Sequence, residues 1–142
     1  MEAKALKTRW LATFPEMQQY FVMISKLTEN GPCQVGPPIL PILRGQLTYS
    51  KLANILFQAR AAAGVKDAGW LLTKACHDPS SPLYGSRIVA MIHDEYLLET
   101  THDSAGEAMK EIERLAVLGM GSVTPLVPIT ASAHKMSCWT KA

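Results

Sequence analysis

The chain has 142 residues, of which 48% are hydrophobic and 18% charged, and its formal net charge is +2 at pH 7. This composition is typical of one globular domain, and so small a positive charge excludes a protein that binds nucleic acid over its whole surface. A nucleic-acid site would have to be local, or shared with a more basic partner. Three scattered cysteines and the charged N-terminal segment predict a cytoplasmic protein with free thiols and no signal peptide. No stretch approaches the roughly 18 apolar residues of a membrane span, so we expect no membrane partner.

Two helices are predicted at the start of the chain, over residues 2–12 and from about residue 15 to residue 30. Thr13 is a suitable N-cap, Pro15 fits the first turn of the second helix, and Asn30-Gly31 is a typical helix stop. Residues 32–48 are rich in proline, which excludes both a helix and a central strand. We expect an extended loop there, at most with a broken edge strand.

The longest helical pattern runs over residues 49–76 and has a broad apolar face. Two short apolar runs follow, residues 88–92 and 96–98, and predict a β-hairpin within residues 86–100 with His93, Asp94 and Glu95 at its tip. Residues 104–142 then predict a helix ending at Gly119 and Gly121, a strand over residues 126–131 and a tail. The predicted fold is a single α+β domain, residues 1–142, with helices packed on a small antiparallel sheet.

The three polar residues at the hairpin tip allow two interpretations. Asp is common in tight turns for backbone reasons alone, so the first interpretation is a polar turn with no further role. Alternatively, the carboxylates of Asp94 and Glu95 hold a divalent cation such as Mg²⁺, which prefers oxygen ligands. Because neighbouring side chains on a strand point in opposite directions, only one of them is expected to be a direct ligand.

Asn54 and Gln58 lie four residues apart, hence on one face of the long helix. Amide side chains there either face water or contact the acceptor atoms of the DNA minor groove, which are nearly alike for all base pairs. Arg44, Arg60 and Lys66 could reach phosphates, although scattered basic side chains usually form only a solvated face.

The dipeptide His-Asp occurs three times, at residues 77–78, 93–94 and 102–103. Metal-dependent phosphohydrolases use such pairs on packed helices, and here the pairs fall in predicted loops and in the hairpin. An HD-type phosphohydrolase is therefore the weaker alternative.

Together these motifs resemble the palm of family A DNA polymerases, of the phage or plasmid type. "IVAMIHDEYLLE" resembles the strand–V-H-D-E–strand motif, and "YSKLANILFQARAAAGVK" is similar to the N-x-x-x-Q-G-x-A-A-D-x-x-K helix. "KTRWLATFPEMQQYF" resembles the helices that follow the fingers, and "SAHKMSCWTKA" resembles the C-terminal tail. The resemblance covers essentially the whole chain, in the family's order.

The resemblance implies a role for each candidate residue. Asp94 would bind both Mg²⁺ ions of the polymerase site, Glu95 would be an accessory acidic group, and His93 would contact the primer terminus. Asn54 and Gln58 would contact the minor groove of the new duplex. The implied substrates are primer–template DNA and a deoxynucleoside triphosphate.

The sequence also departs from the family. Ala59, Ala63 and Ser50 stand where the family has Gly, Asp and often Arg. The chain has no D-Y-S-x-x-E strand for the second catalytic aspartate and no R-x-x-x-K-x-x-x-[FY]-G helix for the triphosphate. We therefore expect a chain that is inactive alone and works with a companion polypeptide carrying the rest of the palm, the fingers and the thumb. The alternative is a non-catalytic, DNA-binding or structural relic of such a polymerase.

Overall fold

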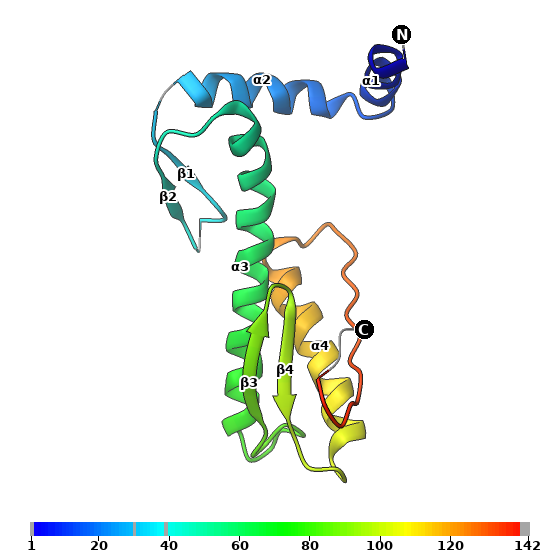
Figure 1. Cartoon of the computed structure of the whole chain (residues 1–142). Coiled ribbons are helices and arrows are strands. Elements are labelled where there is room, and N and C mark those ends of the chain that lie inside the picture. Colours follow the sequence, from blue (N-terminus) through cyan, green and yellow to red (C-terminus); the bar gives the residue numbers. More distant parts are fainter. Residues whose placement is uncertain (1, 30, 39, 140–142) are drawn as a thin grey trace. The chain divides into compact units, whose positions relative to one another are not determined.

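The computed structural model describes residues 2–29, 31–38 and 40–139, and the chain divides into two compact units, one reaching Ala59 and the other starting at Arg60 (Figure 1). Within the described residues there are four helices and two antiparallel sheets of two strands each. The predicted α+β class is therefore confirmed. Length alone predicts one domain, whereas each unit has its own hydrophobic core; helix α3 (Tyr49–His77) is continuous across the boundary.

The first unit begins with helices α1 (Glu2–Thr13) and α2 (Glu16–Glu29). The break between them lies at Pro15, which has no backbone N–H to continue the first helix. Asn30, half of the predicted helix stop, lies outside the described residues. Gly31 has a φ of 82°, the left-handed conformation that commonly follows a helix.

The proline-rich segment contains a small sheet where the sequence predicts an extended loop. Strand β1 (Cys33–Val35) pairs antiparallel with β2 (Ile42–Arg44), and Gln34 lies opposite Leu43. Both strands have three residues, so they avoid Pro37, Pro38 and Pro41 in the connection between them. Val35 is buried against Ile24 of α2 and Leu52 of α3, which form the core of this unit.

The second unit contains the C-terminal part of α3, strands β3 (Arg87–Ile92) and β4 (Glu95–Glu99), and helix α4 (Ala105–Val123). The two strands run beside α3, as Figure 1 shows. Leu72 and Leu83 are fully buried, and Leu115 of α4 packs into the same cluster. Ile88, Tyr96 and Leu98 cover this core from the strands.

Helices α3 and α4 approach most closely at Ala68 and Gly119. A Cβ atom on Gly119 would overlap the backbone N and Cα of Ala68, so only glycine fits. The sequence predicts that α4 ends at Gly119 and Gly121, and this is wrong because the helix continues to Val123. The glycine reflects close helix packing and not a helix stop. At Val123, the last residue of α4, the carbonyl oxygen accepts a 2.8 Å hydrogen bond from Arg60 Nη1. The guanidinium group of Arg60 is therefore used within the fold.

The strand predicted over residues 126–131 is absent from the described residues, where residues 124–139 form irregular structure. Pro125 and Pro128 cannot donate ladder hydrogen bonds, and an apolar run forms a strand only beside a partner. The segment is instead attached to α4, because the Ala133 N–H donates to Glu113 Oε1 at 2.9 Å.

Candidate metal and nucleic-acid site

The connection between β3 and β4 carries the candidate metal ligands. The strands pair antiparallel with Ile92 opposite Glu95, so His93 and Asp94 form a two-residue turn. Glu95 is the first residue of β4, one position beyond the turn in which the sequence places it. All three side chains are exposed. Among the described non-glycine residues, His93 alone has a positive φ, 57°, a conformation that costs energy and recurs at functional sites.

The turn is supported by strands that pack on the core of the second unit. Residues of β3 alternate between exposed and half-buried, and a register shift between Ile88 and Ala90 marks a bulge. The hydroxyl group of Tyr96 donates a 2.9 Å hydrogen bond to the carbonyl oxygen of Val65 on α3. Burial raises the pKa of Tyr96, so the hydroxyl stays protonated and remains a donor at neutral pH. The turn that contains Asp94 is thus held by strand packing and by a long-range hydrogen bond.

Gly69 makes room for Tyr96, and no motif in the sequence points to this contact. It lies inside α3, and a Cβ there would overlap the hydroxyl oxygen of Tyr96 and crowd its ring. A glycine in a helix interior lowers the stability of the helix, so it often marks a place where another chain segment packs closely. Which segment comes close could not be read from the sequence.

Asp94 and Glu95 supply the oxygen ligands that suit Mg²⁺, and both are accessible from solvent. Within the described ranges, no group of three or more His, Cys, Asp or Glu side chains is arranged to hold a metal ion. The two carboxylates therefore fit part of a magnesium site. Asp94 lies in the turn, whereas Glu95 is the first residue of β4, opposite Ile92.

The predicted DNA contacts fall in both units. Asn54 and Gln58 are exposed and lie one helical turn apart on α3, and Arg44 is exposed at the end of β2; all three belong to the first unit. Lys66 is exposed on α3 in the second unit, as is the turn with Asp94. The amides thus share one accessible helix face.

The other two His-Asp pairs have local roles. His77 Nδ1 lies 2.8 Å from the carbonyl oxygen of Thr73, at the end of α3. Asp78 accepts hydrogen bonds from the Ser80 N–H and hydroxyl, and these hold the pKa of Asp78 below its usual value. His102 and Asp103 are highly exposed, 3.8 Å apart. His77 is the last residue of α3, Asp78 lies beyond it, and His102 and Asp103 precede α4, so neither pair lies within a packed helix as the phosphohydrolase alternative needs.

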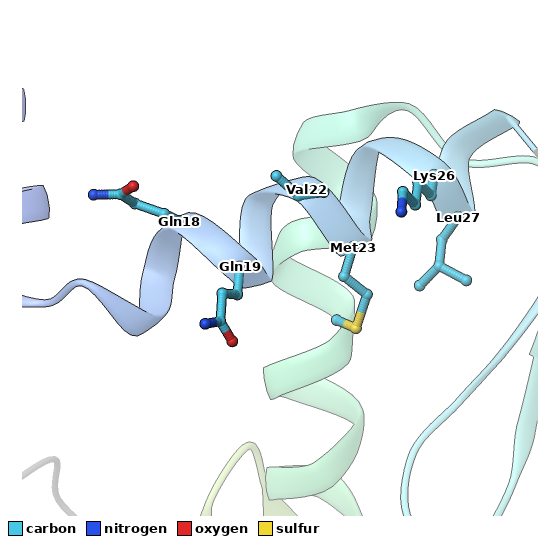
Figure 2. Close-up of a pocket in the computed structure, with 6 residues that line it drawn as sticks. All are labelled: Gln18, Gln19, Val22, Met23, Lys26 and Leu27. Atoms are coloured by element: carbon cyan, nitrogen blue, oxygen red, sulfur yellow. The ribbon is translucent and has the colours of Figure 1, made fainter.

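A shallow hollow lies on α2, between two neighbouring rows of side chains (Figure 2). Gln19, Met23 and Leu27 project to one side of the helix in this view. None of the predicted site residues lines the hollow. It is therefore separate from the candidate metal ligands and DNA contacts.

In the part of the chain that the structure describes, no helix has the length and apolarity to cross a membrane. Comparisons with protein-family models, with curated proteins and with solved structures found no match. The chain's function must therefore be inferred from its own residues and the structure that they form.

Proposed function

We propose that this chain is the C-terminal palm segment of a family A DNA polymerase and supplies one metal-binding carboxylate to its two-metal site. The observation that carries the proposal is the placement of Asp94. Its carboxylate is exposed in a two-residue turn between paired strands, after His93 and before Glu95. This order of residues and elements matches the H-D-E motif that the sequence resembles.

The chemistry assigned to the turn is phosphoryl transfer to a primer 3′-hydroxyl. Two Mg²⁺ ions would stabilise the attacking and the leaving oxygen atoms. Asp94 is the residue of this chain that holds the metal, and Glu95 adds negative charge beside it. His93 can donate a hydrogen bond from its ring to a phosphate oxygen at the primer end. His93 has a positive φ of 57°, a conformation that recurs at functional sites.

A companion polypeptide completes the site in this proposal. A two-metal site takes carboxylates from separate strands, and the triphosphate needs cationic side chains around it. The companion supplies these together with the rest of the palm, the fingers and the thumb. Exposed apolar side chains support such a partner: Val89 and Met91 on β3 are 53% and 49% exposed, and Leu43 on β2 is 78% exposed.

In this proposal the exposed amides and two exposed basic side chains bind duplex DNA. Asn54 and Gln58 donate hydrogen bonds to N3 and O2 acceptors in the minor groove, which report pairing geometry and not sequence. Arg44 and Lys66 contact phosphates, so their contribution weakens as salt concentration rises.

One observation favours a second candidate, a non-catalytic relic that binds DNA. Ala59 and Ala63 stand where the family's helix has a Gly and an Asp, and both side chains are buried. The carboxylate of that helix is therefore lost in this chain. The relic would keep the minor-groove contacts of Asn54 and Gln58 without any metal chemistry.

The proposal is tested with an affinity-tagged chain and the companion that co-purifies with it. The pair should extend a primer on a DNA template in the presence of Mg²⁺, and the chain alone should not. Extension by the isolated chain would exclude the need for a companion. Metal-dependent nucleotide hydrolysis by the isolated chain, without primer extension by any pair, would instead favour the phosphohydrolase.

A further inference from the structure

Most of the chain's aromatic side chains gather in the first unit. The chain has ten Phe, Trp and Tyr residues, and six of them form one connected series with ring centroids 5.1 to 6.4 Å apart. The members are Trp10, Phe14, Tyr20, Phe21, Tyr49 and Phe57. They come from α1, the α1–α2 connection, α2 and α3. So concentrated a series calls for a physical explanation.

Four of the six rings are exposed, whereas Tyr20 packs against the core of the same unit. Trp10 is 40% exposed, Tyr49 is 39% exposed and Phe57 is 59% exposed, whereas Ile24 and Leu52 fill the core of the same unit. The rings are nevertheless held in place. Tyr20 anchors the series, because its hydroxyl donates a 2.6 Å hydrogen bond to the carbonyl oxygen of Ala53. Fixed rings with open surfaces are suited to stacking against another planar group.

A groove of about 510 Å³ adjoins the aromatic series. Phe21 and Tyr49 line it, and Lys7, Thr8 and Gln18 add a cation and hydrogen-bonding groups. None of the described lining residues is acidic. Residues 1–59 contain six Lys or Arg and three Glu, and all six basic side chains are exposed. The groove therefore combines two aromatic rings with one cation, Lys7, on a unit that carries more basic than acidic side chains.

We propose that this groove binds single-stranded nucleic acid together with the ring of Trp10, which adjoins the lining residue Phe21 at a centroid distance of 6.3 Å. One base stacks on Tyr49 in the groove, a second stacks on Trp10, and a backbone phosphate lies at Lys7. Stacked aromatic rings within a positively charged groove are the usual means of holding a single strand without reading its sequence. A duplex does not fit this chemistry, because its bases are already stacked on one another. The site uses none of the residues of the proposed metal centre, so it does not depend on the polymerase assignment.

The test uses the full chain and a fluorescein-labelled oligothymidylate of about 20 nucleotides, longer than the usual site of one such module. Binding is followed by fluorescence anisotropy at several salt concentrations. Trp10→Ala and Tyr49→Ala should each weaken binding by roughly tenfold, and Trp10→Phe should restore most of it. Lys7→Gln should also lower the slope of log affinity against log salt by about 0.7, whereas the ring variants should leave that slope unchanged.

Matched controls come from the second unit. Trp70→Ala removes another exposed tryptophan and Lys110→Gln another exposed lysine, and both should bind as the wild type does. Asp94→Asn should also retain binding, which separates this site from the proposed polymerase function. Circular dichroism identifies any variant that fails to fold. Lys7→Gln changes only an exposed side chain, so its effect on binding can be measured even if a ring variant does not fold.

Three results would overturn the proposal. The first is no binding at ~100 µM protein, a concentration at which even non-specific nucleic-acid binding is normally seen. The second is an equal loss of affinity in the Trp70→Ala and Trp10→Ala variants. The third is tighter binding to a duplex of the same length.

Discussion

The hydroxyl group of Tyr96, on the strand that follows the Asp94 turn, donates a 2.9 Å hydrogen bond to the carbonyl oxygen of Val65 on α3. Gly69, one helical turn further along α3, leaves the space for the tyrosine ring. This contact joins residues that are 31 positions apart in the chain. It attaches the hairpin to the longest helix.

Replacing Tyr96 by Phe keeps the ring and removes the hydrogen bond. We expect the free energy of unfolding of the second unit to fall by about 1 kcal/mol, the usual net contribution of one hydrogen bond. Amide hydrogen exchange in β4 and in the adjacent turns of α3 measures the loss. Tyr84→Phe is the matched control, because Tyr84 is 60% exposed, and it should change exchange rates little.

The stability of the protein should decrease at alkaline pH. Burial raises the pKa of Tyr96 above its value of 10.0, and burial together with the nearby Tyr49 raises the pKa of Tyr20. The folded state therefore holds its phenolic protons more tightly than the unfolded state does. This stabilisation is complete below pH 10 and is lost as the pH rises through the raised pKa values.

Urea unfolding at pH 9 and at pH 11 measures this dependence. Tyr96→Phe should show a smaller decrease in stability between the two pH values than the wild type. An identical decrease in both proteins would mean that Tyr96 titrates alike in the folded and unfolded states.

Two glycines of α4 should respond in opposite ways to alanine. Gly119→Ala should destabilise the protein by about 1–3 kcal/mol, because its Cβ would overlap the backbone of Ala68. At Gly121 no atom lies within 4 Å of the Cβ that alanine would add, so Gly121→Ala should stabilise the helix by about 0.5–1 kcal/mol. Thermal unfolding followed by circular dichroism compares them. A similar loss in both variants would contradict the close approach of α3 and α4.

The turn residue His93 should be replaceable by Gly without loss of stability. Its φ of 57° is unfavourable for a residue with a Cβ, and glycine is usual at such positions in two-residue hairpins. We expect His93→Gly to raise the free energy of unfolding by up to about 1 kcal/mol, and to reduce primer extension by the pair with its companion. A stable variant with unchanged extension would show that the imidazole has no role at the primer end.

The helices are predicted well because the sequence patterns that indicate them involve only residues close together in the chain. Periodicity over residues 49–76 and the break at Pro15 each depend on neighbouring residues only, and α3 and the α1–α2 junction lie where they are expected. The errors concern contacts between distant residues. Gly119 resembles a helix stop until Ala68 is seen against it, and residues 126–131 resemble a strand although no partner strand is available to them in the described structure.

The candidate site divides in the same way. His93, Asp94 and Glu95 are recognisable because they interrupt two apolar runs. The anchor formed by Tyr96, Val65 and Gly69 could not be predicted, because no local pattern shows which helix carbonyl a tyrosine will reach. For the same reason, the sequence suggests Arg60 as a phosphate contact, whereas in the structure its side chain donates a hydrogen bond to the carbonyl oxygen of Val123.

The central claim is that the carboxylate of Asp94 binds catalytic magnesium, and single-turnover primer extension by the assembled pair tests it most directly. Asp94→Asn preserves the size of the side chain and removes its charge, and Glu99→Gln makes the same change at an exposed carboxylate on the far end of β4. We predict that Asp94→Asn lowers the rate of nucleotide incorporation by at least about a hundredfold with the companion still bound, and that Glu99→Gln leaves the rate unchanged. Incorporation by the Asp94→Asn pair at the wild-type rate would contradict the claim and favour the non-catalytic relic.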